Sequence, residues 1–141
     1  YILNSGDLDT NVMQFLTYSF CGKRLKPLEI LRNIEGIRME EFITLCHRYS
    51  HYAALYILNE VAGNKVNRLG FWGMQFLRWD SALTSLMKEG RIDDSMPLAM
   101  CSAATEAIEK IRRGIMPPSF STLFMFQKFM EIKYPKTSKK D

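Results

Sequence analysis

The sequence predicts an all-α protein, and three observations support this prediction. Apolar residues recur at the spacing of amphipathic helices along most of the chain. No segment shows the sustained apolar–polar alternation of a strand, and no Asn-Gly or Asp-Gly dipeptide marks a hairpin. With 141 residues, 47% of them hydrophobic, the chain can bury a sizeable core as one domain or as two small packed subdomains.

Four helices are expected in the first half of the chain. The first runs through Val12, Phe15, Leu16 and Ser19, and the other three have the predicted ranges 27–34, 39–47 and 50–62. Asp9 or Thr10 can cap the first helix, and Gly22 can end it in the left-handed conformation that glycine tolerates. Pro27 suits the first turn of the second helix, because an N–H group there would have no helical partner. Gly63 ends the fourth helix.

Four more helices are expected in the second half. Their predicted ranges are 68–79, 80–88, 95–113 and 119–133. The first of these is apolar almost all round, which is typical of a helix enclosed by others. Ser95 caps the long third helix, Pro97 lies in its first turn, and Gly114 ends it.

These helices predict two packed four-helix subdomains joined by a short linker. The first subdomain covers residues 1–63, the linker 64–67, the second subdomain 68–134, and a flexible basic tail 135–141. Four large apolar side chains are expected in the core: Trp72, Phe76, Leu123 and Phe126. No apolar run is long enough for a membrane-spanning helix, so no transmembrane segment is expected.

The sequence contains no arrangement typical of a catalytic or metal site. His47 and His51 are spaced like a pair of zinc ligands, but Arg48 stands where a zinc-protease helix has its glutamate. No third ligand follows, and there is no glycine-rich phosphate loop or nucleophile elbow. We therefore expect no enzyme, no metal and no cofactor, and we interpret the two histidines as candidates for an acid-sensitive switch.

Several short strings keep the order and spacing of a known family: Tyr1–Leu3, Ser5–Leu8, Phe20–Lys23, Leu28–Leu31 and Leu98–Cys101. Together they resemble the amino-terminal domain of orthomyxovirus matrix proteins, of which the influenza protein is the best known. The resemblance implies the two packed four-helix subdomains of that domain. The stretch 82–92 has only Lys88 and Arg91 where the influenza protein has a dense basic cluster, which indicates a distant branch such as the thogotoviruses.

The resemblance implies a viral matrix protein that self-assembles head to tail into a layer under the envelope. Such a layer bridges acidic membrane lipids and the viral ribonucleoprotein, with non-specific RNA contact as a further expectation. The implied location is the virion and, in the host cell, the cytoplasm, the inner face of the plasma membrane and the nucleus. Six basic residues near predicted helix ends are the candidates to face the membrane or the ribonucleoprotein: Lys23, Arg24, Lys26, Lys110, Arg112 and Arg113.

The sequence leaves one alternative open, a helical-bundle viral adaptor or antagonist, Bcl-2-like, that binds a host protein. An adaptor should expose an apolar groove, whereas a matrix domain should carry complementary charge on opposite faces so that copies can tile. The net charge of +4 permits an anionic partner in either case without requiring one.

Overall fold

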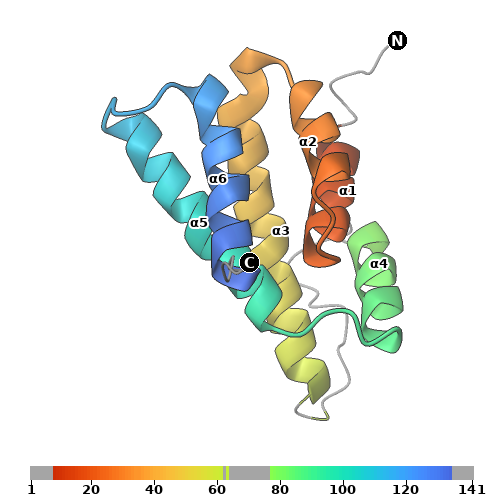
Figure 1. The fold of residues 1–141 in the computed structure, drawn as a ribbon. Coiled ribbons are helices and arrows are strands. Elements are labelled where there is room, and N and C mark those ends of the chain that lie inside the picture. Colours follow the sequence, from red (N-terminus) through yellow and green to blue (C-terminus); the bar gives the residue numbers. More distant parts are fainter. Residues whose placement is uncertain (1–7, 62, 64–76, 135–141) are drawn as a thin grey trace, which may run out of the picture.

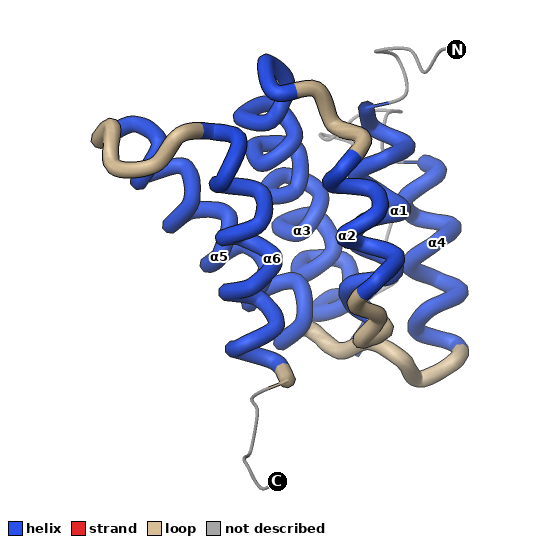
Figure 2. Tube along the Cα trace, turned by 45° about the horizontal axis from the view of Figure 1, so that its top comes forward, coloured by secondary structure: helices blue, strands red, loops and turns tan. Residues whose placement is uncertain are grey.

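The computed structural model describes residues 8–61, 63 and 77–134. All regular structure in this range is helical, which confirms the predicted all-α class (Figures 1 and 2). The described elements are α1 (Leu8–Phe20), α2 (Leu25–Arg32), the 3₁₀ helix η2 (Gly36–Arg38), α3 (Met39–Val61), α4 (Leu77–Lys88), α5 (Ser95–Arg112) and α6 (Pro118–Lys133).

The long helix α3 is the centre of the fold. In Figure 1 it lies between α5 and α6 on one side and α1, α2 and α4 on the other. The sequence predicted two helices over 39–47 and 50–62, and this prediction was wrong. No glycine or proline lies between them, and adding residues to an existing helix is easier than nucleating a new one, so the helix continues through the buried Ser50.

The helix ends follow the glycines. Gly22, Gly63, Gly90 and Gly114 have φ values of 80°, 84°, 67° and 72°, in the left-handed region that glycine occupies without steric cost. After α1 the amide of Lys23 donates to the carbonyl of Tyr18 at 3.0 Å, while the amide of Gly22 donates to Ser19 at 3.0 Å. This pair of hydrogen bonds is a Schellman motif, which fixes the direction in which the chain leaves the helix.

The predicted helix starts needed more correction. The helix α1 already begins at Leu8, so Asp9 and Thr10 lie inside its first turn and do not cap it. Ser95 is the first residue of α5, and its amide and hydroxyl both donate to the carboxylate of Asp93. The prediction that Ser95 caps this helix was therefore wrong, because Ser95 lies inside α5 and its own amide is bonded by the side chain of Asp93. Pro27 and Pro97 lie in the first turns of α2 and α5, as predicted.

One apolar core joins helices from both halves of the chain. Phe15 of α1 packs edge-on against Phe42 of α3, with ring centroids 5.4 Å apart, and against Phe126 of α6 at 5.7 Å. Phe20 of α1 lies 5.9 Å from Phe129 of α6. The described helices therefore share a core, and the predicted pairing of two four-helix subdomains is not observed among them.

The predicted core residues had mixed outcomes. Phe126 is buried, as predicted, but Leu123 is 46% exposed because its side of α6 is only partly covered. Trp72, Phe76 and the linker 64–67 lie outside the described residues, as does most of the helix predicted over 68–79. The end of that helix and the one predicted over 80–88 are continuous in α4, so the predicted break between them was wrong.

Candidate interaction surfaces

The first candidate surface is the turn between α1 and α2. Lys23, Arg24 and Lys26 are exposed there, and none of them forms an ion pair within the described part of the chain. The Schellman motif at Gly22 holds this turn, so the three cations extend from a fixed backbone. Arg91 lies close to Cys21 beside this turn, but its Nε pairs with Glu89 at 3.0 Å, so it adds no unpaired cation.

The other three predicted cations lie elsewhere, at the end of α5. Lys110 is half-buried, and its Nζ lies 5.5 Å from the centre of the Phe124 ring, a cation–π arrangement. Arg112 and Arg113 are exposed. Figure 1 places this end of α5 at the upper left, beyond α6 from the α1–α2 hairpin. The structure therefore separates the six predicted residues into two groups of three.

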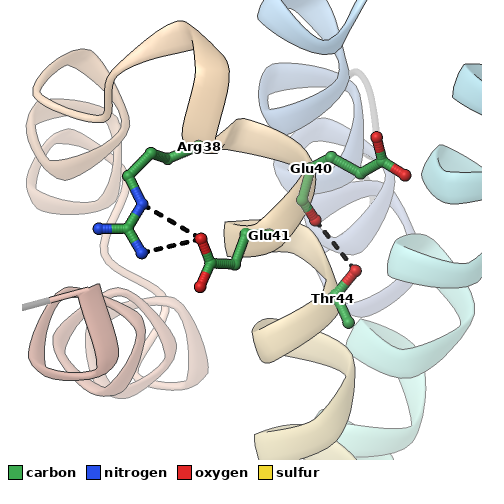
Figure 3. A network of polar contacts seen from close by, with 4 residues as sticks. All are labelled: Arg38, Glu40, Glu41 and Thr44. Carbon is green, nitrogen blue, oxygen red and sulfur yellow. Dashed lines mark hydrogen bonds and ion pairs between the residues drawn. The ribbon is translucent and has the colours of Figure 1, made fainter. Parts of the chain in front are cut away.

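Acidic residues gather at the opposite end of the α1–α2 hairpin, where η2 leads into α3. Glu35, Glu40 and Glu41 are all exposed. Arg38 pairs with Glu41 through Nη2 at 2.8 Å and Nε at 3.1 Å, while the carboxylate of Glu40 points away from that pair (Figure 3). Arg32 is also exposed nearby, so three carboxylates face two guanidinium groups. This end is mildly acidic, and it lies one short helix, about 12 Å, from the basic turn.

The two histidines predicted as an acid switch lie side by side on α3. The ring centroids of His47 and His51 are 6.4 Å apart, with 27° between the ring planes. His47 is half-buried, and burial, followed by the neighbouring His51, lowers the pKa of His47 below its ordinary value of 6.5. Protonating both rings would place two positive charges one helical turn apart. Among residues 8–61, 63 and 77–134, no three His, Cys, Asp or Glu side chains gather as they would around a metal ion.

The adaptor alternative expects an exposed apolar groove, and the structure has one between α2 and α6, a position that the sequence did not predict. Its volume is about 680 Å³, and most of its wall surface is apolar. The residues that line it are Arg24, Leu28, Leu123, Phe126, Gln127, Met130, Glu131 and Tyr134. Two further exposed apolar side chains lie on the helices that form it, Leu25 on α2 and Phe120 on α6. The sequence signal for this groove was the apolar character of α6, which extends over more of its surface than its neighbours cover.

Two charged residues lie on opposite walls of the groove. Arg24 immediately precedes α2, and Glu131 lies in the last turn of α6. Tyr134 closes this end, because its hydroxyl donates to the carbonyl of Phe20 at 3.1 Å and its ring lies against Gly22. Glu131 accepts a hydrogen bond from Gln127 at 3.3 Å, but neither charged residue forms an ion pair within the described chain. The groove thus carries one unneutralised cation and one unneutralised anion.

No helix within the described residues is both long enough and apolar enough to cross a bilayer. Comparison of the chain with models of known protein families, with curated proteins and with solved structures finds no match.

Proposed function

We propose that this chain is a viral matrix domain, which assembles into a layer under the envelope and bridges acidic membrane lipids and the viral ribonucleoprotein. The proposal depends chiefly on the opposite charge at the two ends of the α1–α2 hairpin. Three cations without ion pairs extend from one end, and carboxylates are in excess at the other. The resemblance of the short sequence strings to orthomyxovirus matrix proteins supports the same function. The proposed role is structural, with no catalytic step and no cofactor.

Opposite charge at opposite ends favours a head-to-tail contact. Such a contact is heterologous, so it repeats in one direction and does not close as a dimer. In this arrangement Lys23 and Lys26 of one copy face Glu35 and Glu40 of the next. All four side chains are exposed, so each pair contributes about 1 kcal/mol or less and is screened by salt. Many copies in a layer compensate for the weakness of one contact.

The carboxy-terminal end of α5 is the proposed contact site for the anionic partners of the layer. Arg112 and Arg113 are exposed, whereas Lys110 is held over the Phe124 ring. A cation near an acidic leaflet contributes about 1 kcal/mol, so this group binds weakly in one copy and firmly in an array. The same guanidinium groups suit the phosphates of a ribonucleoprotein and non-specific RNA. The proposed location is the virion and, in the host cell, the cytoplasm, the inner face of the plasma membrane and the nucleus.

Sedimentation velocity against salt tests the head-to-tail contact. Raising ionic strength from about 0.01 M to about 0.15 M shortens the screening length from about 30 Å to about 8 Å and should dissociate the head-to-tail oligomers. Lys23→Glu with Lys26→Glu should abolish head-to-tail association at low salt and leave nothing larger than a dimer, and so should Glu35→Lys with Glu40→Lys. A mixture of these two variants should associate again, because each then offers the charge that the other lost. A protein that stays monomeric at low salt, or oligomers unaffected by either reversal, would contradict the proposal.

Flotation with vesicles tests the membrane part separately. Arg112→Glu with Arg113→Glu should reduce binding to phosphatidylserine vesicles and leave self-association intact. Equal binding to neutral phosphatidylcholine vesicles would show that the basic residues do not carry the contact.

The second candidate function is an adaptor that binds an amphipathic helix of another protein. The α2–α6 groove favours this function, because apolar grooves between helices are the usual receptors for such helices. The low-salt experiment separates the two functions, since an adaptor of this kind requires no self-association.

A further inference from the structure

The α2–α6 groove has a property that an ordinary apolar groove lacks. Its two walls carry opposite charges near the same end, Arg24 on the α2 side and Glu131 on the α6 side. Neither charge has an ion-pair partner within the described chain, although both line one groove. The apolar lining of the groove includes Leu123, which is 46% exposed.

We propose that this groove binds the same groove of a second copy in a two-fold contact. A two-fold axis that runs along the groove exchanges its walls, so α2 of one copy faces α6 of the other. Arg24 of each copy then lies opposite Glu131 of its partner, and both charges are neutralised at once. The exposed side of Leu123 is covered by the apolar wall of the partner. The occupant is a second copy because the face is complementary to itself in both charge and polarity.

The two-fold contact would give the proposed layer its second direction of growth, and this role rests on the proposed function. A single head-to-tail contact produces a line of copies, whereas a layer requires a second contact in another direction. Arg24 and Leu28, the groove residues on the α2 side, lie toward the start of α2, whereas Glu35 and Glu40 follow its last residue. Because it buries apolar surface, it should persist at salt concentrations that dissociate the head-to-tail contact.

The experiment uses the full chain with Glu35→Lys and Glu40→Lys, which removes the head-to-tail contact at the hairpin end remote from Arg24 and Glu131. In this background, sedimentation equilibrium should show a dimer. Adding Arg24→Glu should make the protein monomeric, and so should adding Glu131→Arg, because each creates two like-charge contacts. An equal mixture of the two should form a heterodimer, in which both facing pairs are again opposite in charge. The double reversal Arg24→Glu with Glu131→Arg should dimerise by itself.

A matched pair of leucines tests the apolar part of the contact. Leu123→Ser should weaken the dimer roughly tenfold or more, because it removes a half-exposed apolar side chain that lines the groove. Leu98→Ser on α5 should not change it, although Leu98 is 48% exposed and so matches Leu123 in exposure. Circular dichroism of each variant confirms that the helices remain folded.

The outcomes separate this inference from the proposed function. If the Glu35→Lys/Glu40→Lys protein stays monomeric while the unmodified chain forms salt-sensitive oligomers, the two-fold contact alone is overturned. If the Glu35→Lys/Glu40→Lys protein dimerises but the unmodified chain never exceeds a dimer at low salt, the two-fold groove contact is supported and the proposed matrix layer is overturned. A mixture of Arg24→Glu and Glu131→Arg that stays monomeric, or binding of a foreign amphipathic helix without dimerisation, also overturns the two-fold contact.

Discussion

The interface between α3 and α4 and the interface between α2 and α6 differ in how far the chain completes them. At the α3–α4 interface Trp79 is fully buried, and its indole N–H donates to the carbonyl of Tyr49 at 2.9 Å. The Tyr52 hydroxyl donates to the buried carboxylate of Asp80, and one turn further the Tyr56 hydroxyl lies 2.6 Å from the Thr84 hydroxyl. Apolar and polar groups at this interface are both matched within the chain.

The α2–α6 interface is left open. It exposes part of Leu123 and leaves Arg24 and Glu131 without ion pairs within the described residues. With the proposed two-fold contact, helix packing in this fold serves two purposes. A buried hydrogen-bonded interface holds the chain together, because unpaired buried polar groups would be costly. An open apolar interface with unneutralised charges at its edge is suited to another chain.

The largest predicted effect compares the two sides of α6. Phe126→Ala should lower the free energy of unfolding by about 3–5 kcal/mol, because it leaves a cavity next to Phe15 in the core. Leu123→Ala, on the groove side of the same helix, should cost less than about 1 kcal/mol, because its side chain is only half covered. Urea unfolding of both variants measures the difference. Equal losses would show that the groove side is packed as tightly as the core.

The sequence predicted the carboxy-terminal ends of the helices better than it predicted where a helix continues without a break. The glycines at positions 22, 90 and 114 mark the ends of three helices, because a left-handed residue there is a local requirement that the sequence states directly. The continuity of α3 was missed because no local signal distinguishes Ser50 as a helix cap from Ser50 as a buried helical residue. In the structure, the packing of α3 against its neighbours decides between the two.

The candidate surfaces were predictable only in part. The six basic residues could be identified as exposed cations, but their separation into two groups depends on how α5 and α1 are placed in the fold. Leu123 was predicted to be buried because α6 is apolar on most of its surface, and a pattern of this kind does not reveal which face lacks a neighbour. The groove therefore required the structure, although the excess of apolar surface on α6 was a signal for it.

The next prediction tests the completed interface. Tyr52→Phe removes the hydroxyl that donates to Asp80 and should lower the free energy of unfolding by about 1–3 kcal/mol, since the carboxylate is buried. Tyr56→Phe is the matched control, because its hydroxyl partner Thr84 is only partly buried, and should cost about 1 kcal/mol or less. Thermal or urea unfolding compares them. A larger loss for Tyr56→Phe would contradict the view that the Asp80 contact dominates this interface.

A smaller effect is expected at the turn that leads into the open interface. Gly22 has φ of 80°, so Gly22→Ala should cost about 1–2 kcal/mol from backbone strain alone. Space is not the obstacle, because the added Cβ would lie 3.4 Å from the Tyr134 ring, an ordinary contact. Gly36→Ala is the control. Nothing lies within 4 Å of its added Cβ, and alanine there should be neutral or slightly stabilising. Equal stability of the two variants would show that the turn is not rigid.

The smallest predicted effect is the pH dependence that His47 gives to the packed core. Burial, and then His51, lowers the pKa of His47 in the folded chain, so the unfolded chain binds this proton more readily. The stabilisation is present above the unfolded value of about 6.5 and is lost as pH falls through the folded pKa. Because His47 is half-exposed, the loss should stay below about 1 kcal/mol.

His47→Gln should therefore flatten the dependence of unfolding free energy on pH between about 7 and about 5, and the double variant with His51→Gln should do the same. His47 lies on the side of α3 that faces α5, where its carbonyl accepts a weak hydrogen bond from the Cys101 thiol at 3.7 Å. Acid should therefore lower the free energy of unfolding without dissociating the dimer formed through the α2–α6 groove. Urea unfolding at several pH values measures the first effect, and sedimentation of the Glu35→Lys/Glu40→Lys chain measures the second. An unchanged pH slope in the double variant would remove the histidines from any acid response, whereas a dimer that dissociates between these pH values would place a titrating group in the groove itself.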